Sequence, residues 1–339
     1  MNTPNPHFVL LQPDTYLWLM AAGCLVLTLI CWLIVRYLRR RRRSHPPTPN
    51  THHLTPKAIY LLPLLAWFVL LYGTFVGFAR LEVRQVEFSS PDLPASFDGY
   101  RILHVSDLHV GTYTGWRQSI LERVVDSINA QRADLIVFTG DLQNTVPSDI
   151  YPHKELLSTL KAADGVCSVL GNHDYAGYAD CDEFQKYANC GETRSIEMEM
   201  GWTLLTNGYH AVRRGGERIF IAGMENDGEG RFPQLGDISS ALYRINRQMF
   251  VVMLEHDPSS WRRKILPHSH CQLTLSGHTH GGQFSLFGLT PAQLLYPYSH
   301  GMYYAGQRAM NVSAGVGGVV PFRFGVSPEI TVITLRCKK

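Results

Sequence analysis

Two long apolar stretches without a charged residue lie in the first quarter of the chain, at residues 16–35 and 58–79. At a rise of about 1.5 Å per residue, a helix of roughly 20 residues crosses a hydrocarbon core about 30 Å thick. The pattern therefore predicts two transmembrane helices, preceded by a short tail at residues 1–15. A cleaved signal peptide is the alternative for the first stretch. Against it, the basic residues follow the apolar run, and the run is long for a signal sequence.

From about residue 86 onward, apolar runs of strand length alternate with segments of helix length. Strands are expected at residues 101–105, 134–138 and 166–170, with helices at 118–130 and 153–163 between them. This β-α-β-α-β order predicts a largely parallel sheet with helices on its faces. Because few helices separate the later strands, the pattern favours a sandwich of sheets flanked by helices over residues 86–339. Those later strands are expected at residues 202–205, 218–222, 250–254, 272–275, 310–313 and 330–335.

Charge is distributed unevenly along the chain. Between the two apolar stretches, residues 36–57 form a loop with six arginines, one lysine and no acidic residue. Short basic loops remain in the cytoplasm, so both chain ends and the large domain are expected on the extracytoplasmic side. Such a loop can also bind anionic lipid headgroups. Residues 79–339 carry 24 basic and 27 acidic residues, and this net charge of −3 argues against a general nucleic-acid-binding protein.

Polar side chains with metal-binding chemistry follow five of the expected strands. Because the carboxyl ends of strands in an open α/β sheet meet in one crevice, we expect these side chains to converge. In strand-like tails, Asp107 and His109 would lie on one side, as would His278 and His280. Oxygen and imidazole ligands without cysteine suit Mn, Fe or Zn. The candidate residues are Asp107 and His109, Asp141, Asn172 with His173 and Asp174, His256, and His278 with His280.

These segments resemble the calcineurin-like metallophosphoesterase superfamily over roughly residues 86–335. The residues that carry the resemblance are Asp107-Leu108-His109, Gly140-Asp141, Gly171-Asn172-His173-Asp174, His256 and Gly277-His278-Thr279-His280. The chain is most similar to membrane-attached bacterial phosphohydrolases such as UDP-2,3-diacylglucosamine hydrolase-like enzymes and related phosphodiesterases. That narrower likeness depends on Gly99-Tyr100-Arg101-Ile102, Gly281-Gly282-Gln283 and Pro328-Glu329-Ile330. The resemblance implies an α/β fold, a four-layer αββα sandwich, here preceded by the two transmembrane helices.

The resemblance also implies a centre with two divalent or trivalent metal ions. One ion would be held by Asp107, His109 and His280, the other by Asn172, His256 and His278, with Asp141 bridging both. Two cations about 3.5–4 Å apart need a shared anionic ligand to offset their repulsion. They also lower the pKa of a bridging water, so that hydroxide can attack phosphorus in line near neutral pH.

Several further residues have two interpretations. His173 follows Asn172 and would point away from the metals in an extended segment, so it is expected to protonate the leaving oxygen or to stabilise the transferring phosphoryl group. Asp174 would orient His173 or cap a turn. Arg323 would contact a substrate phosphate or lie solvated in a loop. Cys181 and Cys190 are close enough in sequence to pair, or remain free thiols.

The sequence thus predicts a membrane-anchored phosphoesterase acting on a phosphomonoester, a phosphodiester or a lipid pyrophosphate. Its partners would be the lipid bilayer and a phosphoester substrate, for which a lipid-linked phosphoester is one candidate. No nucleic-acid partner is expected. Its location would be the bacterial inner membrane as a multi-pass protein. The alternatives are a nuclease or nucleotide phosphodiesterase, a cytoplasm-facing UDP-diacylglucosamine pyrophosphatase, and a non-catalytic metal-binding module. The sequence carries no signal for an oligomeric state.

Overall fold

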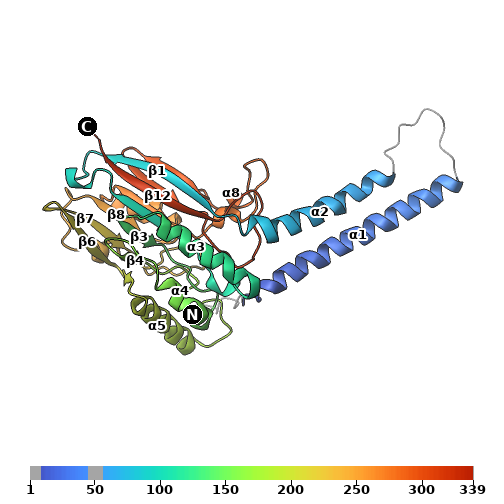
Figure 1. Cartoon of the computed structure of the whole chain (residues 1–339), viewed down its shortest axis with the longest axis horizontal. Helices are drawn as coiled ribbons and strands as arrows, with labels where there is room; N and C mark the ends of the chain where they lie inside the picture. The colour runs from blue at the N-terminus through green and yellow to red at the C-terminus, as the bar shows by residue number, and fades with distance from the viewer. Residues whose placement is uncertain (1–8, 45–55, 339) are drawn as a thin grey trace.

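The computed structural model describes residues 9–44 and 56–338, which form a helical hairpin projecting from an α/β domain (Figure 1). The hairpin consists of α1 (Pro13–Ser44) and α2 (Leu61–Tyr72), with a 3-10 turn at Pro56–Tyr60 before α2 and a π-helical turn at Gly73–Gly77 after it. Over Pro13–Arg41 and Lys57–Gly77 the helices are long and apolar enough to cross a membrane. Only 11% and 22% of their most apolar stretches are buried, so their apolar surface is not covered by the domain.

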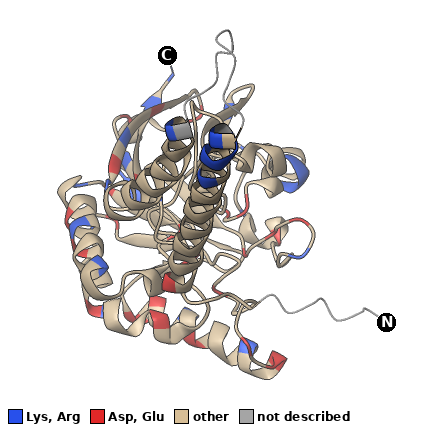
Figure 2. Cartoon of the chain, turned by 90° about the vertical axis from the view of Figure 1, so that its right-hand side faces the viewer, with Lys and Arg blue, Asp and Glu red and all other residues tan. Residues whose placement is uncertain are grey.

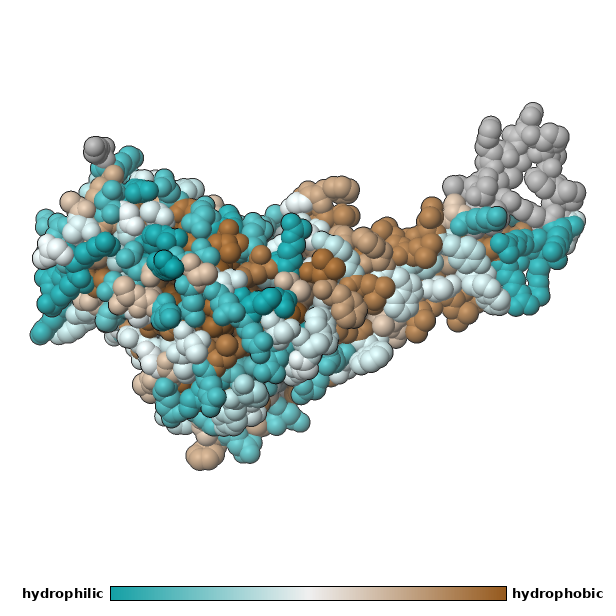
Figure 3. Space-filling model, in the orientation of Figure 1, coloured by the Kyte–Doolittle hydropathy of each residue, from teal (hydrophilic) through white to brown (hydrophobic). Residues whose placement is uncertain are grey.

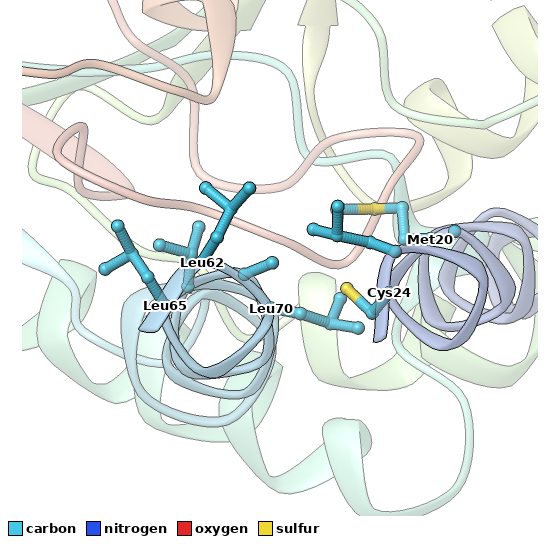
Figure 4. A pocket seen from close by; sticks show the side chains of 9 residues that line it. Met20, Cys24, Leu62, Leu65 and Leu70 are labelled. Atoms are coloured by element: carbon cyan, nitrogen blue, oxygen red, sulfur yellow. The ribbon is translucent and has the colours of Figure 1, made fainter. Parts of the chain in front are cut away.

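The two helices of the hairpin pack along one another. Trp67 Nε1 donates a hydrogen bond to Thr28 Oγ1 at 3.3 Å, which joins α2 to α1. Figure 4 shows Met20 and Cys24 of α1 beside an apolar groove whose other wall carries Leu62, Leu65 and Leu70 of α2. The side chains that line the groove are hydrocarbon apart from the thioether of Met20 and the thiol of Cys24, so the groove fits a lipid chain better than a polar ligand. On the face shown in Figure 3, hydrophobic residues interspersed with paler ones line the hairpin from the domain to the hydrophilic end of α1.

Two six-stranded sheets form the domain. The first has the order β1-β12-β2-β3-β4-β5, and the second has the order β10-β11-β9-β8-β7-β6. Strands β2, β3, β4 and β5 run parallel, as do β7, β8, β9 and β11. The bounds are β1 Glu82–Ser90, β2 Arg101–Val105, β3 Leu135–Phe138, β4 Val166–Ser168, β5 Thr203–Leu204, β6 Gly208–Arg214, β7 Glu217–Gly223, β8 Val251–Leu254, β9 Leu273–Ser276, β10 Gly301–Ala305, β11 Arg308–Val312 and β12 Glu329–Cys337.

The core has one apolar layer between the sheets and another under the helices on each outer face. Along β2, Ile102 packs between the sheets, whereas its neighbour Leu103 packs beneath α3 (Gln118–Ala130). Because successive side chains of a strand point to opposite faces, a strand covered on both sides is apolar at nearly every position. On the far side, Trp261 and Ile265 cover the second sheet. The predicted four-layer sandwich is therefore confirmed.

Some elements differ from those expected. α5 (Glu183–Glu199) was not expected, because it is largely polar and buries mainly Cys190, Thr193, Ile196 and Glu197. The helix expected at residues 153–163 is confined to α4 (Lys154–Leu157). There, the hydroxyls of Ser158 and Thr159 donate to the carbonyls of Lys154 and Leu156, an arrangement that competes with helix continuation.

The hairpin contacts the domain at both ends. Phe78, which follows the π-helical turn, is 1% exposed in the core beside β2. The backbone N–H of Arg323 donates to the carbonyl of Gly73 at 3.0 Å, and a Cβ on Gly77 would lie 1.8 Å from the Arg323 carbonyl oxygen. At the start of α1, the carboxylate of Asp14 lies 2.9 Å from the guanidinium of Arg117. The domain is thus held at a fixed position on the hairpin.

Candidate metal centre

The five segments at the strand ends meet between the two sheets. β2, β3 and β4 of the first sheet and β8 and β9 of the second each deliver their following loop to this place. Asp107, His109 and His256 are 0% exposed, and Asp141 is 1% exposed. The structure therefore brings together all seven side chains that the sequence marked as candidate ligands; five of them are buried, and His278 and His280 are partly exposed.

One group of four side chains has its ligand atoms clustered. Asp107, His109, Asp141 and His280 each present one such atom, and all four atoms lie within 4.8 Å of one another. His109 Nε2 is 3.2 Å from His280 Nε2 and 3.5 Å from Asp141 Oδ2. His280 Nε2 is 3.5 Å from Asp107 Oδ1. The group has the size and composition of a cation site with oxygen and imidazole ligands.

A second group lies on the other side of Asp141. Asn172 Oδ1 is 2.7 Å from His278 Nδ1 and 3.0 Å from His256 Nε2. His256 Nε2 is in turn 3.2 Å from Asp141 Oδ2. The same carboxylate oxygen of Asp141 therefore faces both groups, as a bridging ligand would.

Hydrogen bonds outside the cluster fix the direction of these ligand atoms. His256 Nδ1 lies 2.7 Å from the Thr139 carbonyl oxygen, which can only accept, so Nδ1 carries the hydrogen and Nε2 offers its lone pair. Asn172 Nδ2 donates to the Tyr178 hydroxyl at 2.9 Å, which turns Oδ1 toward the cluster. The backbone N–H of His173 donates to Asp141 Oδ1 at 2.9 Å and leaves Oδ2 for the centre. The lone pairs of these three ligand atoms thus point toward the same place, where they would repel one another unless a cation lay between them. The donor set therefore fits bound cations.

Left-handed backbone conformations, not extended tails, aim most of the ligands. Asp107, His109, Asp141, His278 and His280 have φ angles of 53°, 45°, 59°, 72° and 52°. The expectation that alternation along an extended tail brings the pairs together is therefore wrong. Side chains other than glycine rarely adopt this region, and such strain concentrates at functional sites.

Glycines next to the ligands allow the loops to approach closely. A Cβ on Gly171 would lie 2.2 Å from Asp141 Oδ1, and one on Gly277 would lie 2.2 Å from Asp107 Oδ2. Both distances are far shorter than any real contact. Glycine is therefore required at these two positions for the carboxylates to reach the centre.

Burial and mutual charge set the protonation of the ligands. Burial lowers the pKa of His109 to about 3 and that of His280 well below its usual range, so both imidazoles are neutral, as metal ligands must be. Burial alone would raise the pKa of Asp141, but His256 and His173 hold it well below its usual range. Against the lowering effect of burial, the Asp141 carboxylate raises the pKa of His256 to about 10. At neutral pH a proton therefore occupies His256 Nε2 when no cation is bound, and a metal ion would have to displace this proton.

His173 lies at the edge of the cluster, within a turn. The backbone N–H of Asp174 donates to the carbonyl of Gly171 at 3.1 Å, so the extended segment expected here is wrong. His173 Nδ1 donates to the carbonyl of Asn144 at 2.7 Å, and Nε2 is 3.9 Å from Asp141 Oδ2. Nε2, the ring nitrogen that this hydrogen bond does not hold, thus faces the centre.

Asp174 does not orient His173. Its carboxylate accepts the backbone N–H groups of Asp141, Leu142 and Gly171 at 2.8–2.9 Å, and that of Gln143 at 3.3 Å. The loop that carries Asp141 is therefore wrapped around this side chain. Of the two interpretations, the turn-capping one is confirmed.

Arg323 does not reach a substrate, and it is not solvated. Its side chain is 0% exposed, and its guanidinium donates to the carbonyls of Ala314, Gly315, Gly317 and His280. Burial lowers its pKa to about 10. Both interpretations of Arg323 were wrong, because the glycine-rich segment before it supplies carbonyl groups that enclose the guanidinium. Cys181 and Cys190 are both free.

Aromatic residues around the centre were not identified from the sequence. The ring of Tyr178 stacks on His173 at 4.3 Å, and the rings of Phe232 and Tyr296 meet His278 edge-on at 4.6 and 5.6 Å. None of them has a motif that would mark it. Asp257, whose Oδ2 is 3.6 Å from His278 Nε2, directly follows His256 and could have been noticed.

Comparisons with known proteins identify relatives of this chain. Residues 100–282, which include all seven candidate ligands, match the family model of the calcineurin-like phosphoesterases. The uncharacterised metallophosphoesterase YkuE of Bacillus subtilis strain 168 is 33% identical over 282 residues, covering 78% of this chain and 91% of that protein. A transmembrane protein with a metallophosphoesterase domain from Danio rerio is 30% identical over 308 residues, which cover 88% of this chain and 66% of that protein. The solved structure of a phosphopantetheinyl hydrolase from Mycobacterium tuberculosis is a distant likeness, with 12% sequence identity and a TM-score of 0.41. The match covers 66% of this chain and 92% of that one.

Proposed function

The chain belongs to the calcineurin-like phosphoesterases, which are metal-dependent hydrolases of phosphoesters, and from this we propose that it is a membrane-anchored enzyme with a two-metal centre. Asp107, His109 and His280 would hold one ion, Asn172, His256 and His278 the other, and Asp141 both. The observation that carries this proposal is the position of Asp141 Oδ2, which lies 3.5 Å from His109 Nε2 in one group and 3.2 Å from His256 Nε2 in the other.

Such a pair of ions, when bound, supplies hydroxide from water near neutral pH and neutralises charge on a phosphoryl group. The chain's own residues then divide the remaining work. His173 would protonate the leaving oxygen through Nε2, since its Nδ1–H is held by the Asn144 carbonyl in either protonation state. Tyr178 would keep the ring in place by stacking on it at 4.3 Å. Asp174 would hold the Asp141 loop in the shape that the centre needs.

We further propose that the protein spans the bacterial inner membrane twice, with the domain outside the cytoplasm. Figure 2 shows Lys and Arg gathered at the end of α1, and Figures 1 and 3 show that this end lies away from the domain. Short basic segments stay in the cytoplasm, which supports a domain on the opposite side. A cytoplasm-facing UDP-diacylglucosamine pyrophosphatase would require the reverse orientation.

The other candidate functions have less support. A nuclease would share the same centre, but the part of the chain after residue 78 has a net charge of −3. A non-catalytic binding module would be expected to have lost ligands, and all seven are present here.

The test is purification in detergent with native metals, followed by metal analysis and a substrate panel. The panel contrasts an aryl phosphomonoester, an aryl phosphodiester, a cyclic nucleotide and a lipid pyrophosphate. We expect about two ions per chain and hydrolysis of at least one ester class. A folded protein that binds two ions and cleaves no member of the panel would favour the binding module.

A further inference from the structure

An uncharged, exposed apolar segment follows the last two candidate ligands. No Asp, Glu, Lys or Arg occurs from residue 281 to residue 299. Within this stretch, residues 284–297, which we term the apolar loop, carry several large side chains that are mostly exposed in the described part of the chain. Phe287 is 96% exposed, Leu294 89%, Leu295 78% and Leu289 72%. Several large apolar groups exposed together mark an interaction surface.

The tip of the apolar loop is a tight turn in which a phenylalanine has an unfavourable backbone conformation. Leu286 and Leu289 exchange backbone hydrogen bonds of 2.9 and 3.0 Å around Phe287 and Gly288. Phe287 has φ +52° and Gly288 φ +81°. Two-residue turns with both φ angles positive favour Asn-Gly, since asparagine tolerates this conformation and other side chains are strained. Phenylalanine at this place is both strained and fully exposed, which indicates a role outside the chain.

Aromatic contacts place the apolar loop beside the second transmembrane helix. The ring of Phe284 stacks on Phe324 at 5.7 Å, and Phe324 meets Tyr72, the last residue of α2, edge-on at 5.7 Å. The backbone N–H of Ser285 donates to the Phe324 carbonyl at 2.7 Å. Figure 1 accordingly shows α8 (Ala292–Leu295) next to the domain end of α2. The exposed apolar groups thus continue the apolar surface of the hairpin.

The metal centre lies between this loop and the segment that enters α1. On one side, the Tyr296 ring meets His278 at 5.6 Å, and Thr290 Oγ1 donates to the carbonyl of Gly281 at 2.9 Å. On the other side, the backbone N–H of Leu10 donates to the carbonyl of Tyr178, whose ring stacks on His173. The centre is therefore bordered by the segment that enters α1 and by the loop that adjoins the end of α2.

We propose that the apolar loop inserts into the lipid interface beside the hairpin, and that the centre cleaves a phosphoester whose alcohol is a membrane lipid. The second part of this proposal, cleavage of a lipid phosphoester, which we term the substrate half, rests on the proposed function. A bilayer is the occupant because the loop carries no charge, adjoins a transmembrane helix and presents leucine and phenylalanine, the side chains with which interfacial segments insert. A lipid headgroup beside the loop would then lie next to His278, with His173 across the centre.

Photo-crosslinking in proteoliposomes tests the insertion directly. The full chain is reconstituted in phosphatidylethanolamine and phosphatidylglycerol with benzoylphenylalanine in place of Phe287. The control has the same group in place of Met198, which is 58% exposed on α5, away from the hairpin (Figure 1). A lipid adduct at position 287 alone supports the proposal. An adduct with a second protein chain, or equal lipid adducts at both positions, overturns it.

A paired variant tests the consequence for turnover. Phe287→Asn with Leu294→Asn removes both apolar groups, and asparagine suits the left-handed φ at position 287. The lipid substrate is chosen by the ester class that the wild-type enzyme cleaves in the substrate panel. It is phosphatidic acid if the enzyme is a monoesterase and phosphatidylglycerol if it is a diesterase. Each is supplied as dioleoyl vesicles and as the soluble dibutyryl form. We expect turnover of the vesicle substrate to fall about tenfold or more, because of the lost apolar burial, with that of the soluble form unchanged.

The control variant Met198→Asn should lower neither activity, and the melting temperature of the paired variant should not fall. Equal loss on both substrates, or no loss on either, overturns the inference and leaves the phosphoesterase assignment intact. A wild-type enzyme that cleaves the soluble ester but no vesicle lipid overturns the substrate half. Failure of the wild-type enzyme on every ester, with metals bound, is a failure of the proposed function itself and leaves the crosslinking result to decide insertion.

Discussion

The carboxylate of Asp174 accepts the backbone N–H of Asp141 at 2.8 Å, so one buried aspartate holds the residue that faces both groups of metal ligands. The same carboxylate accepts three more N–H groups, from Leu142, Gln143 and Gly171. Four donors around one anion fix the loop more firmly than side-chain packing alone, because each buried N–H would otherwise lose its partner.

Asp174→Asn should therefore impair both the fold and the centre. An amide offers one oxygen where the carboxylate has two, so at least one buried N–H loses its acceptor. We expect the free energy of unfolding to fall by about 3 kcal/mol and metal affinity by roughly 10–100-fold. Denaturant unfolding and metal titration of the same preparation measure both. Asp182→Asn, at the exposed cap of α5, is the control and should change stability by less than about 1 kcal/mol.

Asp141→Asn should remove the shared anionic ligand while keeping the size of the side chain. With that charge lost, the two ions would repel each other without compensation, and the chain should retain fewer than two. Turnover should fall by more than the roughly 10–100-fold typical of residues that act through a ligand. Elemental analysis and the aryl ester assay check this. Normal hydrolysis by a folded Asp141→Ala protein would show that the assignment of the centre is wrong.

His173→Ala should separate proton transfer from metal binding. His173 Nε2 is 3.9 Å from Asp141 Oδ2, whereas the closest pairs of ligand atoms are 2.7–3.3 Å apart. The variant should keep its metals and lose turnover by about 10²–10⁴-fold for esters with poor leaving groups. The loss should shrink as the leaving group becomes more acidic. A series of substituted aryl esters measures the trend, and equal loss across the series would contradict a proton-donor role.

Glu197 gives a pH dependence of stability that is independent of the metals. Its side chain is 0% exposed and accepts the hydroxyl of Ser168 at 2.5 Å, and burial raises its pKa well above the usual 4.5. The folded state then keeps a proton that the unfolded state releases, so stability falls as pH rises above about 4.5, by up to about 1.4 kcal/mol per pH unit.

In Glu197→Gln this contribution disappears. The variant should unfold at a higher temperature than the wild type at pH 8, and the difference should shrink toward pH 5. Thermal unfolding at the two pH values checks this, with the exposed change Glu122→Gln on α3 as control. A pH profile identical to that of the wild type would mean that Glu197 is ionised in the fold.

Reporter fusions test the orientation in the membrane. A reporter active only outside the cytoplasm should be active after Lys339 and silent after His45. Moving the seven basic residues of the loop outward would oppose a membrane potential that is negative inside, at about 2.3 kcal/mol per charge per 100 mV. The reverse pattern would place the domain in the cytoplasm and make a nucleotide-linked lipid the leading substrate.

Much of the fold and of the candidate centre could be predicted from the sequence. Strands buried on both faces are apolar at nearly every position, and the polar residues after them stand out. Edge strand β1 escaped prediction because Glu82, Arg84 and Glu87 interrupt its apolar pattern. The roles of Asp174 and Arg323 depend on carbonyl and N–H groups brought together by tertiary folding, which no local pattern encodes. The apolar loop escaped for a similar reason, since its leucines resemble core residues until the structure exposes them.

Residues 78–81 alone separate the last turn of the hairpin from β1, and Phe78 is already part of the core. Such a short connection leaves the domain little length of chain on which to move relative to the hairpin, so in the proposed topology its centre would stay at one height above the bilayer. For a substrate held in the same bilayer, encounter becomes a search in two dimensions. Its rate would follow the number of substrate molecules per unit area, so diluting vesicles with buffer would leave turnover unchanged, whereas diluting the substrate among inert lipids would slow it.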